Sequence, residues 1–80
     1  MKSDFEVYDD ISVCLLTPNN EQAWEWVNEH VPEYTSFGGS ICVERRYIED
    51  ICIGILEDSL TIEKDGKNMR VQEYGLYLDS

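Results

Sequence analysis

The chain has 80 residues, a length that predicts a single domain over residues 1–80 with a thin hydrophobic core. Its 17 Asp and Glu residues against 6 Lys and Arg residues give a formal net charge of −11. This charge argues against direct binding to DNA, RNA or an anionic membrane, which carry the same sign, and it favours a basic protein as the partner.

The first predicted element is an N-terminal β-hairpin. Residues 5–8 alternate weakly between apolar and polar side chains, and residues 11–16 form an apolar run typical of a strand. Asp9 and Asp10, between the two segments, are typical of a turn.

A helix is predicted next, from about residue 20 to residue 31, where Pro32 ends it. Asn19 is the expected N-cap, and Gln22 lies three residues later, as a capping box requires. One face of this helix gathers apolar residues at helical spacing: Ala23, Trp24, Val27 and Val31. Trp24 is therefore expected in the core, and Trp26 is expected to be half-buried or exposed.

Residues 33–39 are predicted to form a loop with a tight turn at Gly38 and Gly39, and residues 40–44 a short strand. A second helix is predicted from Arg46 or Tyr47 to Glu57. Its apolar residues fit the helical template throughout: Ile48, Ile51, Cys52, Ile55 and Leu56. Gly54 inside this helix suggests close packing against the sheet.

Residues 60–64 are predicted to form a strand, Asp65 and Gly66 a hairpin turn, and residues 69–78 one returning strand. The predicted order is β-β-α-β-α-β-β. We expect an α+β fold in which a four- to five-stranded, mainly antiparallel sheet carries both helices on one face.

Sites for catalysis or metal binding are not predicted. His30 is the only histidine and lies near the end of the first helix, where a capping or a surface role is more common than a catalytic one. Cys14, Cys42 and Cys52 lie in apolar runs without ligand spacing, so buried, reduced thiols are expected. The N-terminal residues contain no apolar signal segment, and no run is long enough to span a membrane. We expect a cytoplasmic protein that is not an enzyme and needs no cofactor.

The most informative pattern is a row of carboxylates on the first helix. Glu21, Glu25 and Glu29 recur every four residues, Glu33 follows the helix, and no lysine lies between them. Like charges at this spacing each cost the helix a few tenths of a kcal/mol. The rise of a helix, ~1.5 Å per residue, spaces them by about 6 Å, which roughly approximates the charge spacing of a nucleic acid strand. A solvated face that only keeps the protein in solution is the more common explanation of such a row.

Arg45 and Arg46 form the one basic pair, just before the second helix. Two cations at a helix start oppose the helix dipole. Pairing with Glu44, Glu49 or Asp50 is the preferred interpretation over an anion-binding role.

A further set of residues carries a resemblance: Thr17-Pro18, the helix containing Trp24 and ending at Val31-Pro32, Phe37-Gly38-Gly39, residues 43–47, and residues 50–60 with Gly54 inside. In these positions the sequence resembles a family of short bacterial and phage accessory proteins without an assigned activity. The resemblance implies a shared fold and a context of phages and mobile elements. It does not extend to residues 67–80.

Three functional hypotheses follow, of which an enzyme or metal protein built on His30 and scattered carboxylates ranks last. The first is an inhibitor of the anti-CRISPR or DNA-mimic type, which occupies a basic, nucleic-acid-binding surface of a bacterial host protein. Its partner-binding residues would be Glu21, Glu25, Glu29, Glu33, Asp9, Asp10 and Trp26. The alternative is an apolar interaction module or a homodimer, supported by Trp26 and by Tyr74, Tyr77 and Leu78 near the chain end.

Overall fold

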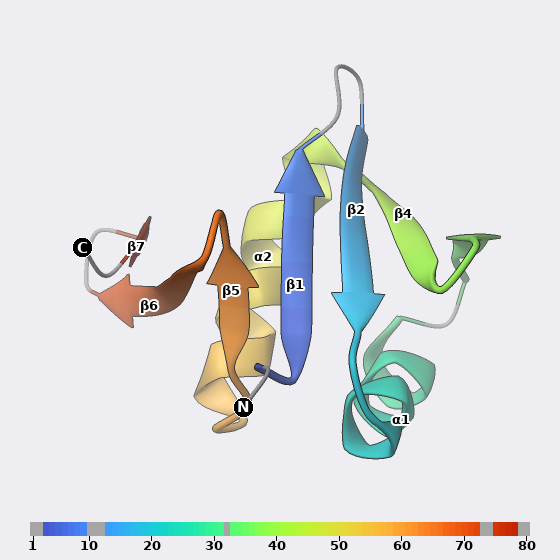
Figure 1. Cartoon of the computed structure of the whole chain (residues 1–80), viewed down its shortest axis with the longest axis horizontal. Helices are drawn as coiled ribbons and strands as arrows, with labels where there is room; N and C mark the ends of the chain where they lie inside the picture. Colours follow the sequence, from blue (N-terminus) through green and yellow to red (C-terminus); the bar gives the residue numbers. More distant parts are fainter. Residues whose placement is uncertain (1–2, 10–12, 32, 73–74, 79–80) are drawn as a thin grey trace.

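The fold is α+β, as predicted, with two helices and a mixed sheet. The computed structural model describes residues 3–9, 13–31, 33–72 and 75–78. Its elements in chain order are β1 (Phe5–Asp9), β2 (Val13–Pro18), α1 (Glu21–His30), β3 (Thr35–Phe37), β4 (Ser40–Glu44), α2 (Arg45–Glu57), β5 (Ile62–Lys64), β6 (Lys67–Gln72) and β7 (Gly75–Leu78). The strands lie in the order β3-β4-β2-β1-β5-β6-β7 (Figure 1). Among the strands that the structure describes, only β1 and β5 are parallel neighbours.

The N-terminal hairpin is confirmed. β1 and β2 pair antiparallel, with Phe5 opposite Pro18 and Asp9 opposite Cys14. The predicted turn residue Asp10 and the predicted start of the second strand, residues 11–12, lie outside the described residues. Alternation of side chains along both strands places one apolar set on the inner side of the sheet, as a half-buried hairpin requires.

The first helix is confirmed, but its N-cap is Asn20 and not Asn19. The Asn20 side chain accepts a hydrogen bond from the Ala23 N–H at 2.8 Å. Asn19 is still part of the strand pairing, because its own N–H donates to the Asp4 carbonyl at 2.8 Å. The helix can therefore begin only one residue later. Pro32, the predicted end signal, lies outside the described residues.

The prediction of four to five strands is wrong, because two further strands form. β3 lies within the predicted loop and pairs with β4 across the Gly38-Gly39 turn. Gly38 has a φ of +63°, a value that two-residue hairpin turns of the primed types need and that glycine adopts at little cost. The single returning strand predicted over residues 69–78 is two strands, β6 and β7, which pair with each other.

The Asp65-Gly66 hairpin turn is confirmed. Both residues have positive φ, 54° and 75°, and they join β5 to β6. Asparagine-glycine and aspartate-glycine pairs favour this geometry because Asn and Asp tolerate the left-handed region and Gly adopts it without a steric cost. α2 is confirmed as well, and it begins directly after β4 without an intervening loop.

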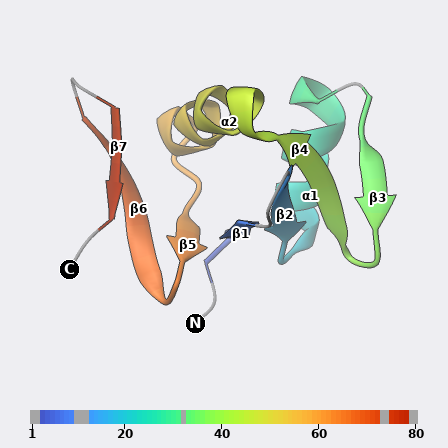
Figure 2. The same cartoon turned by 90° about the horizontal axis from the view of Figure 1, so that it is seen from above.

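The hydrophobic core lies between the inner side of the sheet and the two helices. Figure 2 shows α2 along one side of the sheet, and α1 belongs to the same side because its Trp26 contacts both Phe5 of β1 and Gly54 of α2. The strands contribute Phe5, Val7, Leu16, Ile41, Val43 and Ile62 to the cluster, and the helices contribute Ala23, Trp26, Val27, Cys52 and Ile55. The predicted placement of both helices on one face agrees with this cluster.

The expected roles of the two tryptophans are reversed. Trp26 is only 7% exposed and lies in the core, whereas Trp24 is partly buried at its margin. The Trp26 ring meets Phe5 edge to face, with centroids 6.1 Å apart. A Cβ at Gly54 would lie 3.3 Å from Trp26 Cζ2, so this glycine admits the indole of α1 and does not pack on the sheet as predicted.

Candidate functional site

The acidic face of α1, which we define as Glu21, Glu25 and Glu29, is exposed along its whole length. The opposite side of the same helix is buried through Ala23, Trp26 and Val27. Within the described part of the chain, none of the three carboxylates is in an ion pair. The row that the sequence indicated is therefore a continuous, unneutralised negative surface.

Asp58, the residue that follows α2, joins this surface. A shallow hollow of about 170 Å³ is lined by Gln22, Glu25, Trp26, Glu29, Asp58 and Leu60. Asp58 Oδ2 accepts a hydrogen bond from Trp26 Nε1 at 2.7 Å, which fixes the carboxylate beside α1. No sequence pattern connects residues 32 positions apart, and so the sequence analysis missed Asp58 as part of the acidic surface.

His30 packs against Trp26 and Asp58 at the end of α1. Its ring stacks on Trp26 with centroids 4.4 Å apart, and Nδ1 lies 3.0 Å from the Trp26 carbonyl oxygen. Nε2 lies 3.6 Å from Asp58 Oδ2. These contacts close the end of α1 over the indole and against α2, which agrees with the predicted capping role.

Asp9 does not belong to the acidic face of α1. It ends β1, whereas α1 follows the end of β2 that lies opposite Phe5, so the two are at opposite ends of the hairpin (Figure 1). Asp9 forms an ion pair with Lys64 and accepts a hydrogen bond from Cys14 Sγ at 3.2 Å. The hydrogen bond from Lys64 holds the pKa of Asp9 below its ordinary value. Asp10 lies outside the described residues.

Two other predicted residues contribute little or nothing to the acidic face of α1. Trp26 is buried and offers a partner no contact surface of its own beyond the hollow beside Asp58. Glu33 is exposed, but it lines a separate and larger hollow between the end of α1, the edge of β4 and α2. Of the six proposed binding residues that the structure describes, three lie together on one exposed surface: Glu21, Glu25 and Glu29.

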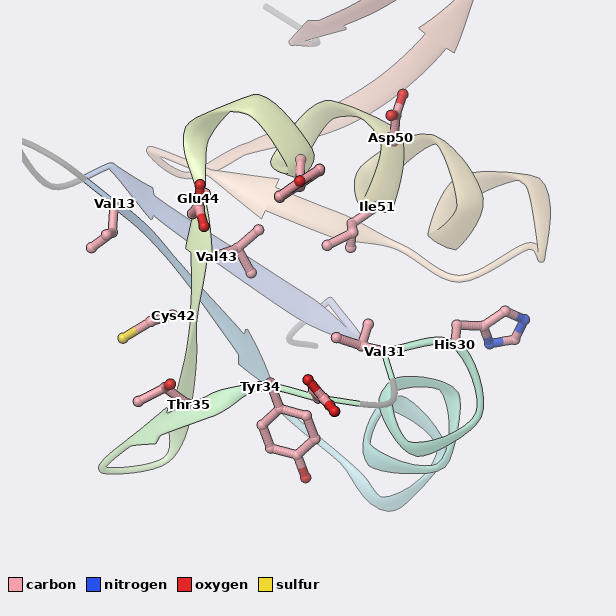
Figure 3. A pocket seen from close by; sticks show the side chains of 12 residues that line it. Val13, His30, Val31, Tyr34, Thr35, Cys42, Val43, Glu44, Asp50 and Ile51 are labelled. Carbon is pink, nitrogen blue, oxygen red and sulfur yellow. The ribbon is translucent and has the colours of Figure 1, made fainter.

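That larger hollow, which we call the groove, has a volume of about 700 Å³ (Figure 3). Carboxylates and tyrosines from three parts of the chain line it, and no Lys or Arg is among its lining residues in the described part of the chain. The lining residues are Val13, His30, Val31, Glu33, Tyr34, Thr35, Cys42, Val43, Glu44, Tyr47, Asp50 and Ile51. No pattern in the sequence suggested the groove, because its walls are contributed by segments that are distant along the chain.

The cysteines are free thiols with a packing role. Cys14 and Cys52 are buried and Cys42 is half-buried. Burial raises the pKa of Cys52 to about 12 and also raises that of Cys14, so both stay protonated at neutral pH. The described residues contain no group of His, Cys, Asp and Glu that could hold a metal ion.

Comparisons with known proteins gave no match. Neither models of protein families nor curated proteins nor solved structures matched the chain. The resemblance to short phage and bacterial accessory proteins therefore stays a prediction. In the described part of the chain, neither helix has the length and apolar character needed to cross a membrane.

Proposed function

We propose that the protein is a non-catalytic inhibitor that occupies a basic, nucleic-acid-binding surface of a host protein. The observation that carries this proposal is the exposed, unneutralised acidic face of α1, extended by Asp58. The net charge of −11 supplies a long-range field that speeds the encounter with a basic partner.

The helix that carries the acidic face is anchored in the core on its opposite side. Ala23, Trp26 and Val27 fix one side of α1 in the core. The hydrogen bond from Trp26 to Asp58 fixes the fourth carboxylate relative to the other three. A rigid array loses less conformational entropy on binding than a row of carboxylates on a mobile segment.

The test is capture of binding proteins from bacterial lysate with tagged protein at low and high salt. We expect a nucleic-acid-binding protein that high salt releases and that DNA or RNA displaces. The variant Glu21→Gln, Glu25→Gln, Glu29→Gln should lose this partner.

The matched control neutralises three other carboxylates, through Glu6→Gln, Glu49→Gln and Asp65→Asn. It has the same net charge as the α1 variant but leaves the acidic face of α1 intact. We expect it to retain the partner. If both variants retained the partner equally well, the acidic face would only keep the protein in solution and the proposal would fail.

A homodimer is the second candidate, and the outer side of the sheet favours it. The register places Tyr8, Leu15 and Cys42 in one row across β1, β2 and β4, on the side opposite the helices. Tyr8 is 65% exposed and Phe37 of the edge strand β3 is 69% exposed. An uncovered apolar row beside an open strand edge is typical of a protein interface.

Two of the residues that first suggested a dimer no longer support it. Trp26 is buried in the core, and Tyr74 lies outside the described residues. Light scattering distinguishes the two candidates. A dimer mass that Tyr8→Ser and Phe37→Ser reduce to a monomer mass supports the dimer, and a monomer mass at high concentration removes it.

A further inference from the structure

The outer side of the sheet, which faces away from both helices, carries an apolar row across neighbouring strands (Figure 2). Tyr8 is opposite Leu15 and Leu15 is opposite Cys42, and Thr35 of the edge strand β3 continues the row beside Cys42. Figure 3 shows Cys42 leaving β4 on the side opposite to the core residue Val43. Tyr8 is 65% exposed, and Leu15 and Cys42 are half-buried. The row is therefore accessible to another molecule.

Carboxylates lie next to this row. Glu6 and Glu63 are neighbours on the parallel strands β1 and β5, and each follows a core residue of its strand, so both point to the outer side. With Tyr8 and Asp65 they line a hollow of about 410 Å³. Among the described residues neither glutamate is in an ion pair, and like charges side by side on adjacent strands destabilise a sheet. A cation from another molecule would relieve this repulsion.

A segment that lies on this side must satisfy its own backbone hydrogen bonds. β1, β2 and β4 each have a neighbouring strand on both sides, so most of their backbone groups are used within the sheet. A helix meets the condition because its backbone hydrogen bonds are internal. The four strands from β3 to β1, at ~4.8 Å spacing, extend over ~14 Å, the length of about ten helical residues.

Charge distinguishes between a second copy of the chain and a different protein. The apolar row alone would suit a second copy, the homodimer considered above. That copy would bring its own net charge of −11 and its own Glu6 and Glu63 to the same side. Repulsion opposes this pairing most strongly at low salt, whereas a basic helix is attracted by the same charges.

We propose that the outer side of the sheet binds a basic, amphipathic helix of a partner protein. The apolar stripe of that helix would lie on Tyr8, Leu15 and Cys42, and its Lys or Arg residues would lie beside Glu6 and Glu63. This surface is on the other side of the sheet from α1. The inference therefore goes beyond the proposed function and does not depend on it.

The probe is a blocked peptide of leucine and lysine, about 14 residues long, in which leucine recurs at helical spacing. It is titrated into isotope-labelled protein while backbone amide shifts are recorded by NMR. We expect the largest shifts at residues 6–8, 13–17 and 40–42. Largest shifts at residues 21–30 would place the peptide on α1 and overturn the proposal.

A peptide of the same composition, with leucine and lysine in strict alternation, tests the requirement for a helix. It should bind roughly fivefold more weakly, because as a helix it has no apolar stripe. Equal affinity of the two peptides would contradict the proposal.

Tyr8→Ser tests the apolar row. It should weaken binding of the helical peptide roughly fivefold, because it removes an exposed ring that the peptide would cover. Tyr47→Ser is the matched control, since Tyr47 is 49% exposed but lies on α2, on the other side of the sheet. It should leave the affinity unchanged. Equal losses in the two variants would count against the proposal.

Glu6→Gln with Glu63→Gln tests the carboxylates. This variant should weaken binding roughly fivefold at low salt, the effect of two ion pairs. A glutamine at position 63 can still accept the hydrogen bond that Ser3 Oγ donates at 2.9 Å, so this contact is kept. Glu25→Gln with Glu29→Gln removes the same charge from α1 and should have less effect. Equal losses would show long-range attraction alone and overturn the proposal.

The two proposals fail in different ways. If neutralising Glu21, Glu25 and Glu29 abolishes capture of the basic protein while Tyr8→Ser binds the helical peptide unchanged, this inference fails and the proposed function stands. If the α1 variant captures the protein as before while the peptide binds the outer side, the proposed function fails and this inference stands. Concentration-dependent shifts at the same strands without peptide would assign the outer side to a second copy and overturn this inference.

Discussion

Trp26 is the residue on which the contact between the two helices depends. It packs edge to face on Phe5, donates to Asp58 and stacks under His30. Each contact restrains a different part of the indole, so the ring has little room to move. Gly54 is the position where α2 passes closest to it.

Gly54→Ala tests this restraint. Replacing a glycine by alanine inside a helix normally raises the free energy of unfolding by ~1 kcal/mol. Here its Cβ would lie 3.3 Å from Trp26 Cζ2 and 3.7 Å from Cη2, and the restrained indole cannot easily yield. We therefore expect no gain in stability, measured by urea denaturation.

The control is the same substitution in a Trp26→Phe background, where the two indole atoms are absent. There Gly54→Ala should raise the free energy of unfolding by ~1 kcal/mol relative to Trp26→Phe alone. An equal gain in both backgrounds would show that the indole does not restrict position 54.

Helical periodicity could not choose between the two tryptophans. Trp24 and Trp26 lie about 160° apart on a helical wheel, and each forms an apolar face with Ala23 and Val27. Trp26 is the buried tryptophan because its indole fits between Phe5 and Gly54 and donates a hydrogen bond to Asp58. These contacts come from distant segments, so no local pattern predicts them.

At the scale of elements, Asp4 connects the start of α1 to the start of β5. Its carboxylate accepts hydrogen bonds from Asn20 Nδ2 at 2.8 Å and from the Thr61 N–H at 2.9 Å and hydroxyl at 3.1 Å. Asn20 is also the N-cap of α1. The position of the acidic helix relative to the sheet thus depends in part on one ionised carboxylate.

The stability of the protein should depend on Asp4 in acid. The hydrogen bond from Asn20, with those from Thr61, lowers the pKa of Asp4 from its ordinary 3.8. A lowered pKa contributes stability above the unfolded value, and this contribution is lost as the pH falls through the folded value. Urea denaturation between about pH 7 and pH 2 should show a shallower acid decline for Asp4→Ala than for the wild type.

At neutral pH, Asp4→Ala should lower the free energy of unfolding by only about 1 kcal/mol, because the site is partly exposed. Glu25→Gln, on the solvent side of α1, is the control and should leave the acid decline closer to that of the wild type. If the stability of Asp4→Ala declined in acid as steeply as that of the wild type, the hydrogen bonds of Asp4 would contribute no measurable stability.

The two strands that the sequence analysis missed are both short segments without a clear alternation. β3 has three exposed residues, Thr35–Phe37, and exists because the Gly38 turn aligns it with β4. β7 begins at Gly75, whose φ of +124° is unfavourable for other residues. Pairing with a neighbouring strand, and not the pattern of side chains, creates these elements.

On the scale of the whole molecule, charge is unevenly placed. The acidic face of α1 has no ion pair among the described residues, whereas Asp9 at the other end of the hairpin is paired with Lys64. The charge of the three α1 carboxylates is therefore not offset by an ion pair within the described residues. This arrangement stabilises binding to a cation and destabilises the folded chain through self-repulsion.

Salt should stabilise the folded protein. Raising sodium chloride from about 10 mM to about 0.5 M shortens the screening length to a few ångströms and should raise the free energy of unfolding by about 1 kcal/mol. The variant neutralised at Glu21, Glu25 and Glu29 should be more stable than the wild type at low salt and less sensitive to salt.

The variant neutralised at Glu6, Glu49 and Asp65 has the same net charge and serves as the control. It should keep more of the salt dependence, because the carboxylate row on α1 remains. If unfolding were independent of salt in all three proteins, repulsion within the row would be too weak to matter for stability.

The sequence by itself determined the acidic helix, α2, the Asp65-Gly66 turn and the N-terminal hairpin. These depend on periodicity, turn chemistry and the cost of burying charge, all of which act over a few neighbouring residues. Tertiary structure alone decided that Trp26 is buried, that Asp58 joins the acidic face and that Asp9 lies away from it. It also created the groove, because strand register and helix packing bring distant segments together, and short-range patterns carry no information about those contacts.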